Sequence, residues 1–277
     1  MARIQDIPFD AVKQVADGAK AAEASRRTCV RVSVVLEKNA PADICVALKD
    51  ALMPKTATGL VHVETLEGDA PVHVNPSCDL AIVVSGATGR AGAVSRAFTG
   101  AGVPCAIVVE TSVEAPAPAE VTGAALIAAA SSEALLDKLA DWMAGACKAD
   151  IALATNFPFV RRAVAKKCVS TRSAQNAAVA ILPLGGADMP VMTANQALMA
   201  LDVAGAYGNG ATIERAAEVS AVVACAFASR AAARKASSLF PGLGLLVKPA
   251  VAFGATCALG YALTVRFEAE NAWKTRH

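Results

Sequence analysis

The stretch from Leu80 to Thr111, LAIVVSGATGRAGAVSRAFTGAGVPCAIVVET, decides the fold class. An apolar run comes first, then a turn with several glycines, a helix of small residues and a second apolar run. Strands that are buried on both faces have this near-continuous apolar character, which is typical of parallel sheets covered by helices. The stretch therefore predicts a strand–helix–strand unit inside a mainly parallel α/β sheet.

Similar segments lie on both sides of this unit. We expect strands at 29–36, 59–66, 71–75, 79–85, 103–110 and 124–130, and helices at 8–27, 41–53, 89–102 and 131–148. Pro41 suits the first turn of its helix, and Ser131 or Ser132 suits an N-cap. Ligands of such sheets bind at the carboxyl ends of the strands, so that edge is where a site is expected.

The strand pattern stops after residue 149, and Ala-rich helical runs follow at 193–207, 212–238 and 243–267. The fold class we predict is therefore α/β plus all-α. Three parts are expected: an N-terminal helix and linker (1–28), an α/β domain (29–148) and a helical domain (150–268). In the last part, Asp188 or Thr193 suits an N-cap, and Gly208 suits a helix C-terminus.

Composition excludes several classes of function. The chain has 277 residues, 55% of them apolar and only 18% charged, with a net charge of +2, so we expect no nucleic-acid partner. Eight cysteines lie in apolar runs without a C-x-x-C pair, which indicates buried or partly buried free thiols in a reducing compartment. The three histidines are scattered, so we expect no metal site. The first 20 residues are charged and amphipathic, which favours an intracellular protein without a secretory signal.

The glycines of the central turn raise the question of a nucleotide. Gly86, Gly89 and Gly92 have the spacing that lets a backbone approach a pyrophosphate at a helix N-terminus, and VVSGATGRAG resembles the opening of NAD(P)-binding reductases. That resemblance implies NAD(P) as cofactor and Glu110 as the ribose-binding carboxylate. However, strands precede the turn, no Tyr-x-x-x-Lys follows it, and the α/β part has only one further strand after the strand–helix–strand unit. We therefore favour a close-packed glycine turn and keep nucleotide binding as the alternative.

No catalytic residue is predicted. Ser85, Thr88 and Ser95 have no histidine partner in any pattern of nucleophilic catalysis. The basic run formed by Arg161, Arg162, Lys166 and Lys167 is expected to be a solvated helix face, with contact to anionic lipid head groups as the alternative.

Residues 29–148 resemble the G domain of small bacterial GTPases of the Era-like kind, most clearly in the closing LIAAASSEALLDKLADWM. The nucleotide motifs of that family are missing. LEKNAPADICVAL stands in place of the phosphate loop, Asn75-Pro76-Ser77-Cys78 in place of D-x-x-G, and Glu110-Thr111-Ser112-Val113 in place of the guanine-reading motif. The resemblance implies a degenerate Rossmann/P-loop-like domain without GTPase activity.

The helical half is similar to the family called domain of unknown function 697, over about residues 175–267. The segments that carry this resemblance are ILPLGGADMPVMTANQALMALDVAGAYG (181–208), ERAAEVSAVVACAFASRAAARKASSLFPGLG (214–244) and GATCALGYAL (254–263). The matching positions are Pro183, Asp188, Pro190, Gln196, Tyr207, Gly208, Arg230, Pro241, Gly244, Thr256 and Gly260. The resemblance implies a helical, membrane-associated domain that often follows an Era-like G domain and has no assigned activity.

Hydropathy leaves two interpretations of this half open. Between Ala236 and Val265 the only charge is Lys248, although the uncharged Pro249–Val265 is slightly short for a membrane span. In one interpretation, 236–265 enters the bilayer, with Arg230, Arg234, Lys235 and Arg266 at the head groups. In the other, these are core helices of a soluble bundle or oligomer. Small residues at helical spacing, Gly254, Ala258 and Ala262, permit close helix approach in either case.

The sequence as a whole favours a non-enzymatic protein associated with the cytoplasmic membrane. We expect it to act as an interaction or scaffold partner, of a GTPase or of itself as a homo-oligomer, with membrane lipid as a further partner. The alternative is an NAD(P)-binding or other nucleotide-binding enzyme that uses Gly86, Gly89, Gly92 and Glu110.

Overall fold

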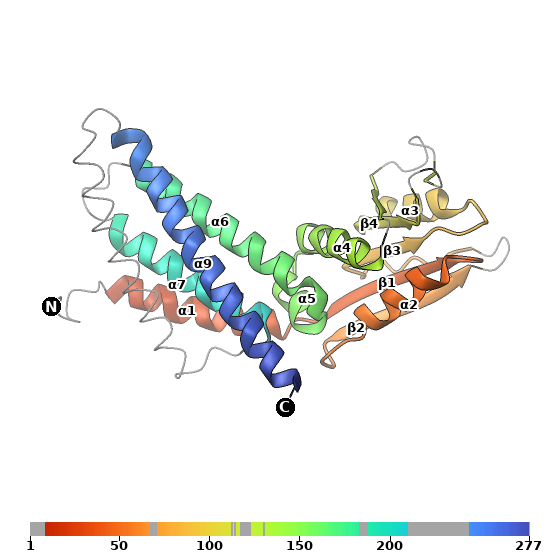
Figure 1. Ribbon diagram of the computed structural model, residues 1–277, viewed down its shortest axis with the longest axis horizontal. Helices are drawn as coiled ribbons and strands as arrows, with labels where there is room; N and C mark the ends of the chain where they lie inside the picture. The colour runs from red at the N-terminus through yellow and green to blue at the C-terminus, as the bar shows by residue number, and fades with distance from the viewer. Residues whose placement is uncertain are drawn as a thin grey trace. The chain divides into compact units, whose positions relative to one another are not determined.

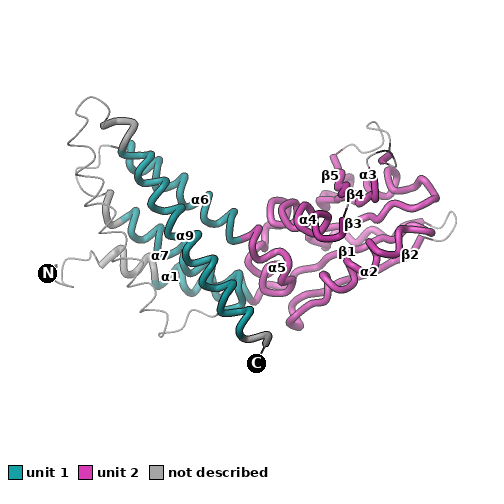
Figure 2. The backbone as a smooth tube through the Cα atoms, in the orientation of Figure 1, with its two compact units in different colours: residues 1–26, 165–277 teal, residues 27–164 magenta. Residues whose placement is uncertain are grey.

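A computed structural model describes residues 9–66, 71–111, 113, 115–116, 123–129, 131–182, 188–209 and 244–276. The chain divides into two compact units (Figure 2), one formed by residues 27–164 and the other by residues 1–26 together with 165–277. The first unit contains the sheet, and the second is helical.

The sheet has five strands, all parallel, in the order β2-β1-β3-β4-β5 (Figure 1). The strands are β1 (Val30–Glu37), β2 (Gly59–Leu66), β3 (Leu80–Val84), β4 (Cys105–Val109) and β5 (Ala125–Ala128). Every residue of β3 and β4 is buried, as expected for strands covered on both faces. The predicted α/β class is confirmed, and residues 80–111 contribute β3 and β4 to the sheet.

The helices in the described part of this unit are α2 (Ala42–Ala51), α3 (Ala91–Gly100), α4 (Ser132–Ala146), α5 (Asp150–Asn156) and the short 3-10 helix η4 (Pro158–Val160). Ser131 caps α4, because its hydroxyl accepts a hydrogen bond from the Ala134 N–H at 3.3 Å. Pro41 occupies the N-cap of α2, one residue before the predicted first turn. In α4, Leu135 and Leu139 are buried, whereas Leu136 and Trp142 are half-buried.

One hydrophobic core lies between the sheet and α3. Val35, Val83 and Ile107 sit opposite one another on three neighbouring strands, and α3 packs Val94 and Phe98 against them. These side chains share a face because alternate residues of a strand point to the same side of the sheet.

The expected strand at 71–75 is not a strand. The segment pairs with no neighbour, yet Val72 and Val74 pack on the core while Pro71, His73 and Asn75 are exposed. Its period-two pattern arises because Val72 and Val74 face the core, so the pattern is real but the strand prediction is wrong.

The helical unit consists of α1 (Phe9–Arg26), α6 (Arg161–Ile181), α7 (Asp188–Ala206) and α9 (Gly244–Arg276) in its described part, with α6 beginning in the sheet unit. Two boundaries differ from prediction. Thr193 lies inside α7 and is not its N-cap, and α9 continues through its charged end to Arg276 instead of stopping near 267. The predicted helix at 212–238 lies outside the described residues.

The core of this unit is formed by the last turns of α7 and by α6 and α9. Val169, Val203 and Leu263 are buried together, and the rings of Tyr207 and Phe267 stack with centroids 5.9 Å apart. Gly208 ends α7 as predicted: its φ is 75°, and its N–H donates to the Gly205 carbonyl.

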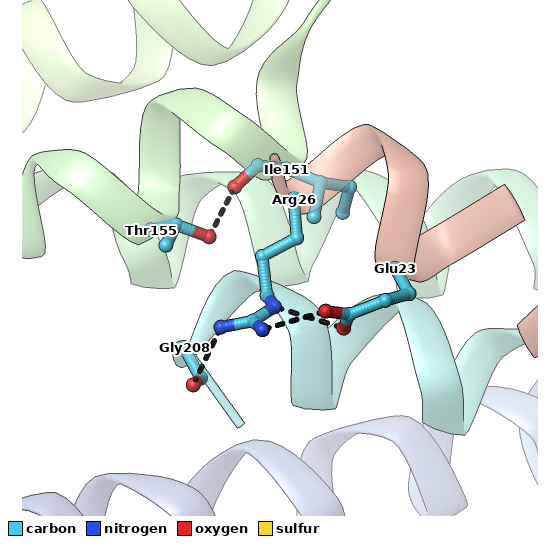
Figure 3. Close-up of polar contacts among 5 residues, drawn as sticks. All are labelled: Glu23, Arg26, Ile151, Thr155 and Gly208. Atoms are coloured by element: carbon cyan, nitrogen blue, oxygen red, sulfur yellow. Dashed lines mark hydrogen bonds and ion pairs between the residues drawn. The ribbon is translucent and has the colours of Figure 1, made fainter. Parts of the chain in front are cut away.

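Helix α1 packs on α7, although the two lie far apart in sequence. A Cβ on Gly18 would overlap the Leu198 side chain, so the helices approach closely there. At the end of α1, Arg26 donates to both carboxylate oxygens of Glu23, at 2.8 and 3.0 Å, and to the Gly208 carbonyl oxygen at 3.4 Å (Figure 3). Hydrogen bonding to Glu23 raises the pKa of Arg26, so this end of α1 stays charged while it contacts the C-cap of α7.

Candidate functional site

The strand order changes direction between β1 and β3. From β1 the chain moves to β2 on one side, and the next strand, β3, lies on the other side of β1. In open parallel sheets, ligands bind at such a point, beyond the carboxyl ends of the two strands. A ligand site is therefore expected between the segments that follow β1 and β3.

These two segments are bound to each other. The Gly86 N–H donates to Glu37 Oε2 at 2.8 Å, and the Ala87 N–H donates to the Lys38 carbonyl oxygen at 3.2 Å. A Cβ on Gly86 would lie 2.5 Å from that same carbonyl oxygen, closer than atoms can pack. Gly86 is therefore required by the close approach of two backbones, and its N–H already holds a carboxylate.

The other two glycines of the turn, Gly89 and Gly92, have different structural environments. Gly89 has a φ of 67° with open space around its Cα, so its backbone conformation requires glycine. Gly92 is buried within α3, where its carbonyl accepts the Ser95 hydroxyl at 2.9 Å. The N-terminus of α3 has no side-chain cap and no acidic residue in its first turn, so its N–H groups and its positive dipole end favour an anion.

Glu110 follows β4 directly and is exposed. Because β3 and β4 are parallel neighbours, Glu110 and the glycine turn lie at the same edge of the sheet. The fold thus brings the predicted nucleotide residues to one edge.

Sequence reasoning missed Glu37, because the first strand was expected to end at residue 36. The available signal was a carboxylate directly after the apolar run VSVVL. Glu37 is only 2% exposed and is the last residue of β1. Its Oε1 atom is buried without a hydrogen-bond partner in the described structure.

A second carboxylate lies nearby on the same face. The register pairs Val35 with Glu64 and Glu37 with Leu66, so Glu37 and Glu64 both project to the α3 side of the sheet from adjacent strands. Glu64 is half-buried, and its Oε2 atom also lacks a partner.

The cysteines within the described residues are all free, and no group of three His, Cys, Asp or Glu side chains there is arranged to hold a metal. Burial raises the pKa of Cys105 to about 12, and burial also raises the pKa of Cys45 and of Cys78. A thiol with a raised pKa is a poor nucleophile, which agrees with the expected structural role. Cys29 is exposed, however, so the expectation that every cysteine is at least partly buried is wrong.

The helical unit presents a different kind of surface. Among the described residues, one helix is long and apolar enough to cross a membrane: Lys248–Trp273 in α9, which has 26 residues and whose most apolar 18-residue window has a mean hydropathy of 1.4. Only 33% of its most apolar window is buried. The outward side carries Phe253, Tyr261 and Val265, which are 40%, 53% and 63% exposed. Gly254, Ala258 and Ala262 are also exposed.

The inward side of α9 is joined to α6 and α7 by neutral polar groups. Thr256 accepts hydrogen bonds from Asn176 at 3.0 Å and from Gln196 at 3.2 Å, and Asn176 accepts one from Asn195 at 3.1 Å. All four residues are buried. The hydroxyl of Thr256 donates to the Ala252 carbonyl, so its bonding capacity is filled.

Comparison with known proteins finds no matching family model, no matching curated protein and no matching solved structure.

Proposed function

We propose that this protein is a non-enzymatic, membrane-associated interaction protein that contacts lipid through the outward face of α9. The observation that carries the proposal is the uncharged stretch Pro249–Val265, whose outward residues are apolar and exposed. A core helix of a soluble protein is mostly buried, whereas α9 buries only a third of its apolar window.

The length and the ends of this stretch support the proposal. Seventeen helical residues span about 25 Å, slightly less than the hydrocarbon core of a bilayer. Lys248 precedes the stretch and Arg266 follows it, where long basic side chains reach head groups. The resemblance of residues 175–267 to a membrane-associated family leads to the same proposal.

The way α9 is held also suits a lipid environment. Lipid tails give no hydrophobic drive for helices to associate, so membrane helices pack through small residues and interhelical hydrogen bonds. Both occur on α9, where Gly260 lies against Val169 of α6 and Thr256 binds Asn176 and Gln196.

The test is flotation of the full chain with liposomes that contain anionic lipid. Wild-type protein is expected to float with the vesicles, and Val265→Glu is expected to reduce the bound fraction about tenfold or more, because a carboxylate on the lipid-facing side of a helix opposes insertion. The matched control is Val46→Glu on α2, which places the same charge at a similarly exposed valine (58%) of the sheet unit.

Equal flotation of the two variants would contradict the proposal, as would wild-type protein that stays with the soluble fraction. Circular dichroism of both variants establishes that they are folded. Since Val265 is 63% exposed, the substitution should leave the folded unit intact.

NAD(P) binding at Gly86, Gly89, Gly92 and Glu110 is the second candidate. The uncapped N-terminus of α3 and the open space at Gly89 favour it. We place it second because the Gly86 N–H that a phosphate would use is bonded to Glu37. A rise in melting temperature with NADPH for wild type, absent in Gly89→Asp, would make it the leading candidate.

A further inference from the structure

We propose that Glu37 and Glu64 form a cation-binding site at the carboxyl edge of the sheet, beside the glycine turn. The ligand is a small cation, either a divalent metal ion or the ammonium group of an organic molecule. The proposal rests on the sheet unit alone and is independent of membrane association.

The first step is the burial of Glu37. Its side chain is 98% removed from solvent, and a single hydrogen bond, from the Gly86 N–H at 2.8 Å, reaches one of its two oxygens. The other oxygen is buried and has no partner in the described structure. An ionised carboxylate away from water normally has several donors or a paired charge, because burying it otherwise is very costly.

The second step is the position of Glu64. Adjacent strands lie about 4.8 Å apart and two residues along a strand add about 6.6 Å, so the Cα atoms of Glu37 and Glu64 are about 8 Å apart on one face. Both glutamate side chains project from the same face of the sheet, and the Glu37 carboxylate is held in place by the Gly86 N–H. Each has one buried oxygen without a donor, which is the arrangement that a shared cation would complete.

The third step is that no basic side chain of the described residues forms an ion pair with Glu37 or Glu64. On the same face of β1, Arg31 lies six residues before Glu37, about 20 Å away along the strand. The neighbouring Lys38 is exposed, in contrast to the buried carboxylate.

The chemistry of the pair limits the ligand. Mg²⁺ commonly uses one or two carboxylates and keeps several waters, and Ca²⁺ accepts carboxylate and backbone oxygens. An organic ammonium group would instead donate hydrogen bonds to the two free oxygens. An anion is excluded from this point by the two negative charges.

The experiment measures the melting temperature of the full chain after dialysis against a chelator, with MgCl₂, CaCl₂ or spermidine added at matched ionic strength. Wild type is compared with Glu37→Gln, Glu64→Gln and the control Asp141→Asn, which changes an exposed carboxylate of α4. We expect at least one cation to raise the melting temperature of wild type and of Asp141→Asn by about 2 °C or more, and to leave both Gln variants unchanged.

The cation that raises the melting temperature identifies the kind of site. A rise with Mg²⁺ or Ca²⁺ indicates a metal site, and a rise with spermidine alone indicates a site for an organic amine. Without added cation, the Gln variants should melt at or above the wild-type temperature, because the amide keeps the Gly86 contact and removes an uncompensated charge.

Three results would overturn the proposal. One is that no cation shifts wild type, and another is that all four proteins respond equally. The third is that Glu37→Gln melts far below wild type in every condition, which would make Glu37 only the acceptor for Gly86. If Glu37→Gln does not fold, Glu64→Gln gives the same comparison, since Glu64 is half-buried and holds no backbone group in the described structure.

Discussion

At the scale of single residues, Gly86 shows how one hydrogen atom in place of a methyl group lets two segments meet. The backbone after β1 and the backbone after β3 bond through Gly86 and Ala87, with no room for a Cβ between them. The glycine spacing was visible in the sequence, but its cause was not, because the partner segment lies almost 50 residues earlier.

Gly86→Ala is expected to lower the free energy of unfolding by about 1–3 kcal/mol, because the new methyl group must displace backbone and not a flexible side chain. The matched control is Gly145→Ala in α4, where the Cβ meets open space. It should raise stability by about 0.5–1 kcal/mol through helix propensity. Urea denaturation followed by circular dichroism measures both, and equal effects of the two substitutions would contradict this account.

Glu37 marks the limit of residue-level prediction at the candidate site. A glutamate after an apolar run is ordinary in sequence, and solvent exposure would be the usual expectation. Glu37 becomes a buried acceptor because the segment after β3 donates the Gly86 N–H to it. The register of β1 and β2 places Glu64 on the same face. The predicted glycines and Glu110 do share an edge, since parallel strands end on one side.

At the scale of elements, the strands were the most predictable part. Runs of Val and Ile gave β1, β2, β3 and β4 to within two residues, because a buried parallel strand has no polar face to obscure it. The strand predicted at 71–75 was wrong, although its pattern of apolar residues resembles that of a strand. Val72 and Val74 alternate because they face the core, and a lone sequence does not distinguish this from ladder pairing.

Helix ends were less predictable than helix existence. Thr193 is a good N-cap residue, but α7 begins five residues earlier, at Asp188. The charged end of α9 was expected to lie beyond the helix, yet the helix continues to Arg276. Tyr207, which directly follows α7, donates a hydrogen bond to Glu268 in this end of α9 at 3.1 Å. For α9, this hydrogen bond is a tertiary contact, which local propensity does not contain.

Helix α9 contains two glycines whose replacement should have opposite effects. Gly260→Ala is expected to destabilise the helical unit by about 1–3 kcal/mol, since the Cβ would lie 2.4 Å from Val169, a β-branched side chain with little rotamer freedom. Gly254→Ala meets open space and should stabilise α9 by about 0.5–1 kcal/mol.

Both α9 variants can be measured by chemical denaturation of the full chain, in the transition that reports the helical unit. The prediction fails if Gly260→Ala is as stable as Gly254→Ala, because the close approach of α9 to α6 would then not exist in solution.

At the scale of the whole molecule, the sheet unit reaches further along the chain than the strand pattern indicated. Asn156 of α5 is fully buried, and its side chain bonds Thr56 and Thr58, while its carbonyl accepts the Lys55 N–H. The short helices after residue 149 therefore complete this unit, although their sequence looks like the start of the helical half.

A fragment of residues 27–164 is expected to unfold cooperatively on heating, whereas a fragment that stops at residue 148 is expected to lose the cooperative transition. The shorter fragment removes Leu153, Phe157 and Val160, all of which are fully buried, and leaves the segment before β2 without the Asn156 contacts. Differential scanning calorimetry compares them, and matching transitions would show that α5 and η4 are dispensable.

The pairing of α1 with α7 has a consequence for how the chain is made. Helix α1 leaves the ribosome well before its packing partner α7, which is synthesised about 160 residues later, after the sheet unit. At ordinary translation rates that delay is on the order of ten to thirty seconds. During that interval the sheet unit has time to fold around its own core, while α1 has no α7 to pack against. The packing of α1 on α7 is therefore a late event of biosynthesis, and a chaperone that shields an unpacked helix during translation would act on Phe9–Arg26.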